Sequence, residues 1–131
     1  MERREAVIVG SGPAGAATAL RLAALAPELA AGMLLLDKAR HPRDKTCAGG
    51  VIPKALRLLE ELGVPLAVPH ARVDAAGVAV PGRTLAVGGS DLCRVVRRRE
   101  LDAALAWAAR APCAATGGVE VRPTLPRQAT A

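Results

Sequence analysis

Three glycines and one aspartate are spaced so that together they could bind a dinucleotide. Gly10, Gly12 and Gly15 follow a short apolar run in the spacing G-x-G-x-x-G, and Asp37 ends a second apolar run. Glycines allow a sharp turn and a close approach of the backbone to a pyrophosphate. A carboxylate after the second strand accepts hydrogen bonds from ribose hydroxyls. The spacing therefore predicts a dinucleotide site.

The elements that must position these residues are a strand, a helix and a second strand. Residues 6–9 and 33–36 are apolar runs of strand length. Between them, the alanine- and leucine-rich segment 14–26 predicts a helix, with Pro13 in its first turn, where a missing N–H costs nothing. A helix N-terminus offers N–H groups and a positive dipole end to phosphates. This order of elements is that of a dinucleotide-binding βαβ unit.

A second glycine-rich loop follows a basic segment. Residues 38–45 are polar and basic and predict a loop, in which His41 is expected to be solvated. Small residues at 46–50 then lead to a helix predicted over 54–62. Such a loop is a second place where backbone can meet an anion or a flat ring, although an ordinary surface loop is the alternative.

Composition indicates one globular domain. The 131 residues are enough for a single core, and a hydrophobic fraction of 51% argues against disorder. The only aromatic residue is Trp107, so the core must be built from alanine, valine and leucine. Trp107 itself is predicted to pack as an anchor on a helix over 100–110.

Charge and cysteine usage narrow the class of protein. The formal net charge is +6, which an anionic cofactor and a solvated surface explain. We expect no nucleic-acid partner, because aromatic residues for base stacking are lacking. Cys47, Cys93 and Cys113 are widely spaced, which favours neither a disulfide framework nor a metal site and predicts a cytoplasmic location. We also expect no membrane-spanning segment.

The segments V-I-V-G-S-G-P-A-G, L-L-L-D-K and P-R-D-K-T-C-A-G-G together resemble the geranylgeranyl reductase family. These FAD-dependent oxidoreductases are related to flavoproteins of the para-hydroxybenzoate hydroxylase type. The resemblance covers residues 6–110. It implies an α/β, Rossmann-like fold with a parallel sheet in a three-layer core, incomplete at the C-terminus, and a short β-hairpin insertion. It also implies FAD as cofactor, an isoprenoid whose C=C bond is reduced, and NAD(P)H as one electron donor.

The pattern and the resemblance together assign residues to the cofactor. Arg98 is placed by counting back from Leu101-Asp102 in the family's R-x-x-[FL]-D motif, with Arg97 as the alternative. A guanidinium at this position can hold a phosphate by a forked pair of bonds. The residues assigned to FAD are Gly10, Gly12, Pro13, Ala14, Gly15, Asp37, Lys38, Lys45, Cys47, Ala48, Gly49, Gly50 and Arg98.

No side chain is assigned as a catalytic acid or nucleophile. Cys47 is the one reactive candidate, because the family's K-x-C-x-G-G segment lines the flavin side of the site. The alternative is that Cys47 is a small residue that fills a tight loop.

The predicted organisation is an N-terminal part of an FAD-binding domain over 1–110, with the hairpin insertion at 64–90. An irregular tail follows at 111–131, with a short strand predicted at 119–122. Family members continue for hundreds of residues, so we expect a piece of a longer protein or a chain ended by a frame change, inactive alone. The alternatives are an aromatic hydroxylase fragment, a plain NAD-binding domain and a non-catalytic remnant. A lipid substrate would allow peripheral membrane contact, and the sequence does not define an oligomeric state.

Overall fold

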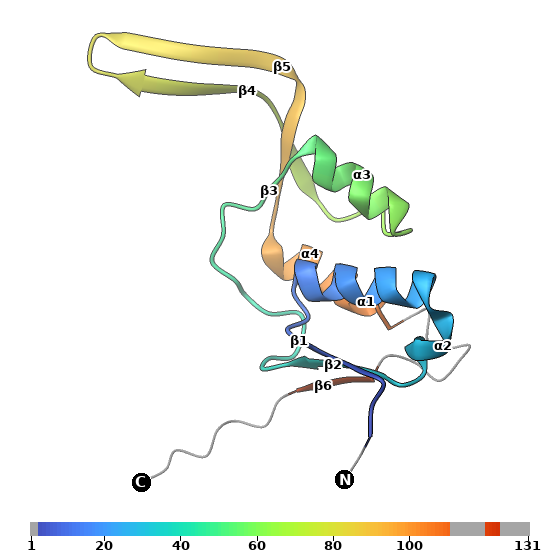
Figure 1. Cartoon of the computed structure of the whole chain (residues 1–131). Coiled ribbons are helices and arrows are strands. Elements are labelled where there is room, and N and C mark those ends of the chain that lie inside the picture. Colours follow the sequence, from blue (N-terminus) through green and yellow to red (C-terminus); the bar gives the residue numbers. More distant parts are fainter. Residues whose placement is uncertain (1–2, 111–119, 124–131) are drawn as a thin grey trace, which may run out of the picture.

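The computed structural model describes residues 3–110 and 120–123, which form two three-stranded sheets and four helices (Figure 1). This architecture confirms the predicted α/β fold class. In chain order the elements are β1 (Ala6–Val9), α1 (Pro13–Leu25), α2 (Pro27–Ala30), β2 (Met33–Asp37), β3 (Gly50–Val51), α3 (Pro53–Glu61), β4 (His70–Val80), β5 (Arg83–Val96), α4 (Arg98–Ala108) and β6 (Glu120–Pro123).

The first sheet is parallel, in the order β1-β2-β6. Figure 1 shows α1 and α4 together on one side of this sheet, and Ile8 of β1 points toward them. Val7 and Val9 alternate with Ile8 and lie on the other face, where they are 52% and 77% exposed. In the described ranges, helices therefore cover one face of the parallel sheet, and a third layer is not among these residues.

Small and aliphatic side chains fill the space between the sheet and the helices. Leu101 and Leu105 of α4 are buried in the same cluster as residues of α1 and β2. The prediction that Trp107 anchors this helix is wrong, because its side chain is 55% exposed. Leu101 and Leu105 are one helical turn apart and define the buried face, and Trp107 projects from the opposite face. The core cluster comprises Ala16, Ala19, Leu20, Met33, Leu35, Val51, Leu56, Val96, Leu101, Leu105 and Ala109.

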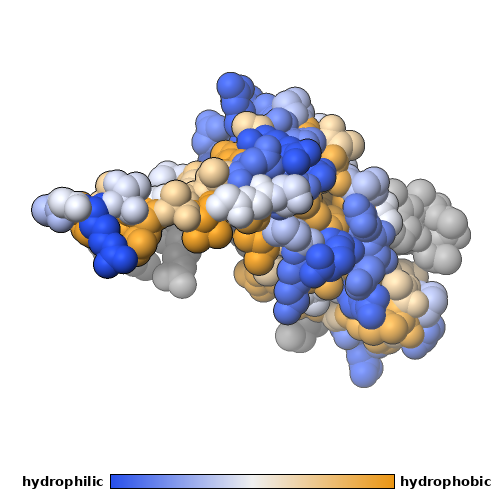
Figure 2. Space-filling view, turned by 90° about the horizontal axis from the view of Figure 1, so that it is seen from above, coloured by the Kyte–Doolittle hydropathy of each residue, from blue (hydrophilic) through white to orange (hydrophobic). Residues whose placement is uncertain are grey.

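The second sheet, in the order β3-β5-β4, is antiparallel and contains a long hairpin. Its turn lies at Pro81 and Gly82, within the 64–90 segment predicted to hold a hairpin, and Gly82 has a φ of 77°. The strands have 11 and 14 residues and the second ends at Val96, so the hairpin extends past residue 90, where the insertion was expected to end. Pairing continues past an irregularity between Val73 and Ala75. Figures 1 and 2 show the hairpin projecting from the body as an arm.

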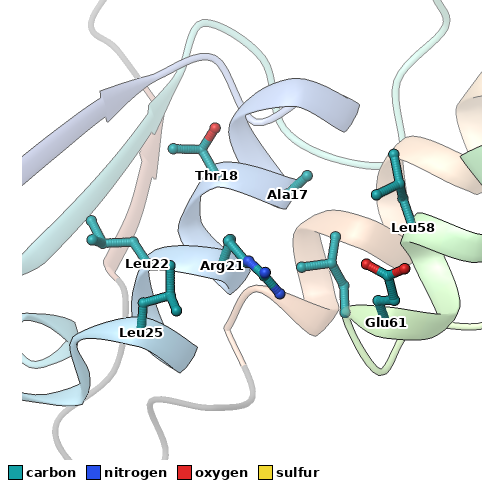
Figure 3. Close-up of a pocket in the computed structure, with 8 residues that line it drawn as sticks. Ala17, Thr18, Arg21, Leu22, Leu25, Leu58 and Glu61 are labelled. Carbon is teal, nitrogen blue, oxygen red and sulfur yellow. The ribbon is translucent and has the colours of Figure 1, made fainter.

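An apolar groove of about 530 Å³ lies between α1 and α3 (Figure 3). Its charged side chains are Arg21 and Glu61, and the rest of the lining is almost entirely aliphatic. A groove of this kind offers little chemistry of its own. The lining residues are Ala17, Thr18, Arg21, Leu22, Leu25, Leu58, Glu61 and Leu62. Among the helices of ranges 3–110 and 120–123, none has the length and apolarity that crossing a membrane requires.

Candidate functional site

The turn between β1 and α1 needs glycine at two positions. Gly10 has a φ of 100°, a conformation that other residues rarely adopt. A Cβ on Gly15 would lie 1.7 Å from the carbonyl oxygen of Gly10, so α1 can approach the turn only without a side chain there. Gly12 is the N-cap of α1, and no side chain caps this helix end. The described structure therefore leaves the N-terminal N–H groups of α1 without a side-chain acceptor.

Asp37, at the end of β2, closes this turn. Its Oδ2 accepts hydrogen bonds from the Ser11 N–H at 2.8 Å and from the Ser11 hydroxyl at 2.5 Å, and its Oδ1 accepts one from the Ala39 N–H at 3.0 Å. Burial acts to raise the pKa of Asp37, but these bonds and the nearby Arg43 outweigh it and leave the pKa below its ordinary value. The carboxylate is 4% exposed and retains little accepting capacity for a ribose.

His41 is not solvated, so that prediction is wrong. Its side chain is 5% exposed, and its Nε2 lies 2.7 Å from the Ser11 hydroxyl oxygen. Because the Ser11 hydroxyl donates its single proton to Asp37, Nε2 must carry the proton that it shares with Ser11. Burial, followed by the charge of Arg43, lowers the pKa of His41. A neutral imidazole therefore covers the bond between Ser11 and Asp37.

Two arginines from distant segments meet at Gly12. A Cβ on Gly12 would lie 3.5 Å from Arg43 Nη2 and 3.9 Å from Arg98 Nη2. Arg43 comes from the loop after β2, and Arg98 is the first residue of α4. Guanidinium groups hold phosphates by paired hydrogen bonds. The helix N-terminus and the two arginines together make a site with the donors and charge that a diphosphate requires.

Arg97 and Arg98, the two candidates for the motif arginine, differ clearly in how exposed their side chains are. The Arg97 side chain is 85% exposed, whereas that of Arg98 is 19% exposed and lies beside Gly12. A hydrogen bond from Arg98 to Asp102 outweighs the effect of burial and raises the pKa of the guanidinium. Arg98 therefore remains charged at the site.

A cavity of about 600 Å³ adjoins Arg98 and brings three of the predicted residues together. Lys45, Cys47 and Arg98 all line it. The Gly49 N–H donates to Cys47 Sγ at 3.4 Å, and this bond, followed by contact with Arg98, lowers the pKa of the exposed thiol. The full lining is Asp44, Lys45, Thr46, Cys47, Val96, Arg97, Arg98, Arg99 and Glu100.

The other residues assigned to FAD lie near the Gly12 turn or near the cavity beside Arg98. Gly49 has a φ of 75°, and a Cβ there would lie 2.1 Å from the carbonyl oxygen of Val96, so this loop can lie against β5 only with glycine. Gly50 begins β3. Lys38 is exposed just beyond Asp37 and does not line the cavity. The remaining positions are Pro13 and Ala14, in the first turn of α1, and Ala48, exposed in the loop.

Sequence reasoning missed Arg43, His41 and Asp102. Arg43 stands in a basic loop in which no spacing distinguishes it from its charged neighbours. Asp102 served only to count back to Arg98, although a spacing of four residues on a helix is itself a signal for an ion pair. For His41 the sequence carries no comparable signal.

Sequence comparison links the chain to menaquinone reductases. A 40% identical match over 62 residues links the chain to a menaquinone reductase of Mycolicibacterium smegmatis, and a 42% identical match over 60 residues links it to one of Mycobacterium tuberculosis. The matched segments cover 47% and 46% of this chain but 14% of each relative. The chain is therefore much shorter than the curated relatives that it matches.

Solved structures show the same fold. The flavin-dependent brominase Bmp2 matches 92% of this chain and 29% of its own, with a TM-score of 0.70 and 21% identity. A 2-methyl-3-hydroxypyridine-5-carboxylic acid oxygenase matches 92% of this chain and 31% of its own, with a TM-score of 0.61 and 23% identity. The FAD binding domain family matches residues 3–129, nearly the whole sequence. The chain therefore belongs to this FAD-binding domain family of flavin-dependent oxidoreductases.

Proposed function

We propose that this chain is the FAD-binding part of an oxidoreductase that reduces a carbon–carbon double bond in an isoprenoid chain. The observation that carries the FAD site is the convergence of Arg43 and Arg98 on Gly12, at the uncapped N-terminus of α1. The proposal that the substrate is an isoprenoid has separate support. It comes from the K-T-C-A-G-G segment and from the similarity to menaquinone reductases, since menaquinone carries an isoprenoid tail.

The residues present fit the parts of FAD that they would hold. Gly12 presents backbone without a side chain at the helix end, so the pyrophosphate would lie beside this backbone and accept hydrogen bonds from the guanidiniums of Arg43 and Arg98. Ser11 and Asp37 would fix the turn, and the buried Asp37 carboxylate, already bonded to Ser11 and Ala39, would contribute to the site mainly in this way. Lys45 and Cys47 would lie on the flavin side, in the cavity beside Arg98.

When bound and reduced, the flavin would supply the hydride. With that hydride on one carbon and a proton from solvent on the other, the substrate double bond would gain two hydrogens. The described residues bind and orient the cofactor, and a thiol of lowered pKa at Cys47 lies in the same cavity. A lipid substrate also implies contact with a membrane surface, which belongs to the same proposal.

Binding is tested first with the whole 131-residue chain. We expect titration with FAD to quench its fluorescence with one site per chain, and NAD⁺ to compete poorly. Tight NAD⁺ binding without FAD binding would instead identify a plain NAD-binding domain. A folded chain that binds neither ligand would favour a non-catalytic remnant.

Substrate class is tested second, on a chain loaded with FAD and reduced under nitrogen. A short-tailed menaquinone is added, and mass spectrometry follows the quinone tail. A gain of two hydrogens in the tail supports the proposal. A second sample is exposed to air with an aromatic substrate. An unchanged tail under nitrogen, together with hydroxylation of the aromatic ring in air, would overturn the proposal in favour of a hydroxylase.

A further inference from the structure

A fully buried carboxylate lies behind the two arginines of the diphosphate site. Asp102 of α4 is 0% exposed. Its Oδ1 accepts a hydrogen bond from Arg98 Nε at 2.7 Å, and its Oδ2 accepts one from Arg98 Nη2 at 3.0 Å. A carboxylate without contact with solvent must be stabilised by such partners. Asp102 therefore depends on the same cations that face Gly12.

The two hydrogen bonds from Arg98 to Asp102 fix the orientation of the Arg98 guanidinium. A guanidinium is planar and rigid, so two bonds to one carboxylate determine where its other N–H groups point. In Arg98 the bonded atoms are Nε and Nη2, and Nη2 lies 3.9 Å from the position of a Cβ on Gly12. The second N–H of Nη2, which Asp102 does not accept, therefore lies beside the helix N-terminus.

Arg43 shares the same carboxylate from a different loop. Its Nη2 lies 3.4 Å from Asp102 Oδ2 and would lie 3.5 Å from a Cβ on Gly12. Arg43 Nε is buried without a hydrogen-bond partner among the described residues, at 4.0 Å from Asp37 Oδ1. Arg43 therefore contacts Asp102 and approaches Gly12 through Nη2, while its Nε lies near Asp37.

The geometry points to Asp102 as the positioning residue of the diphosphate site. It holds Arg43 and Arg98 side by side at Gly12, where their like charges would otherwise repel each other. It does so from outside the space that a ligand would occupy, since it acts only through the two arginines. This inference rests on the proposed FAD site and adds to it the residue that orients the arginines.

The variant Asp102→Asn tests the inference, because it keeps the shape and removes the charge. Calorimetry of the whole chain with ADP and with adenosine separates the phosphate contribution from that of the nucleoside. We expect the variant to bind ADP about tenfold more weakly, the scale of one charge-assisted hydrogen bond, with adenosine binding unchanged. Asp91→Asn is the matched control. Asp91 pairs with Arg94 at a distance of 2.8 Å, and neither residue lines the cavity beside Arg98. This control should leave both affinities unchanged.

A double-mutant cycle distinguishes positioning from general support of the fold. In a chain that already carries Arg43→Ala and Arg98→Ala, replacing Asp102 with Asn should cause no further loss of ADP affinity. An equal loss in both backgrounds would overturn the inference, and so would an equal loss for adenosine. If the unaltered chain binds neither FAD nor ADP, the proposed function fails, which is a separate outcome.

A measurement on the unaltered chain keeps the inference testable even where the variants do not fold. The Arg98 Nε–H resonance should exchange slowly with solvent, because Asp102 accepts it, and that of exposed Arg97 should exchange fast. Inorganic pyrophosphate should shift the resonances of Arg98 and Arg43 together. Fast exchange at Arg98, or a shift of only one arginine, would overturn the inference.

Discussion

His41 and Asp37 make the stability of the folded chain depend on pH, each in a different pH range. The neutral imidazole of His41 is packed over the bond between Ser11 and Asp37, and its folded pKa lies below the ordinary value of 6.5. The unfolded chain therefore binds a proton near pH 6.5 that the folded chain does not bind. By linkage, the stability that His41 contributes is present above that pH and is lost as the pH falls below it.

We expect the free energy of unfolding to fall as the pH drops below 6.5, by at most about 1.4 kcal/mol for each pH unit. The variant His41→Asn should abolish this dependence, and urea denaturation at several pH values measures it. His70→Asn is the control, because His70 is exposed and bonds only to the Val68 carbonyl in the described structure. If the slope persists in His41→Asn, the imidazole is not its source. The charged groups that act on His41 are Arg43, Asp37, Asp102 and Arg110.

Asp37 makes the stability of the fold depend on pH in a second, more acidic range. Its folded pKa lies below the ordinary value of 3.8, so its stabilising effect is present above that pH and is lost as the pH falls further. We expect Asp37→Asn to cost about 1–3 kcal/mol at neutral pH, because hydrogen bonds to a charged acceptor are lost. As the pH falls below 3.8, unfolding measurements should show a smaller loss of stability in the variant than in the unaltered chain. Equal acid sensitivity of the two chains would contradict this.

At the scale of elements, two glycines of one turn should respond differently to alanine. A Cβ on Gly15 meets the Gly10 carbonyl at 1.7 Å, so α1 must shift. A Cβ on Gly12 meets only side-chain nitrogens of Arg43 and Arg98, at 3.5 and 3.9 Å, which is ordinary contact. The first substitution affects how the helix packs on the strand, and the second affects only the space at the helix end.

We therefore expect Gly15→Ala to destabilise the fold by at least about 2 kcal/mol and to abolish FAD binding. Gly12→Ala should change stability by less than about 1 kcal/mol and still weaken FAD binding at least about tenfold, because the methyl group occupies the diphosphate space. Thermal unfolding and FAD fluorescence titration report the two effects separately. A Gly12→Ala chain that binds FAD normally would show that the diphosphate does not approach this backbone.

Local signals explain which elements the sequence predicts well. The βαβ unit depends on apolar runs, glycine spacing and proline placement, all within 37 residues of the N-terminus, and these match β1, α1 and β2. The lengths of the two arm strands depend on cross-strand pairing rather than on composition. The alanines and glycines in these strands give little strand signal, so the sequence did not predict their lengths. Arg43, His41 and Asp102 come together by tertiary packing between a loop and a helix, which no local spacing records.

At the scale of the whole molecule, the arm presents an apolar face in the described structure. Val78 lies directly opposite Leu85. Val80 is two residues from Val78, and Val87 is two residues from Leu85, so all four side chains lie on the same face of the arm. These side chains are 52% to 66% exposed. An exposed apolar face on a free pair of strands favours association.

We expect the double variant Val78→Lys, Leu85→Thr to reduce concentration-dependent association without destabilising the body. Because both side chains are largely exposed, the free energy of unfolding should change by less than about 1 kcal/mol. Light scattering over a dilution series measures association, and urea denaturation measures stability. A large loss of stability would mean that the arm packs onto the body in solution.

The shared carboxylate at Asp102 has a consequence for how the chain acquires its ligand. The glycine turn, the loop with Arg43 and the start of α4 are far apart in sequence, and they meet only around this buried group. A growing polypeptide that already contains the whole βαβ unit would still lack its phosphate-binding arginine pair until α4 had been synthesised and docked. Ligand capture would then follow tertiary folding, and FAD, by binding only the folded chain, would select molecules in which that step is complete.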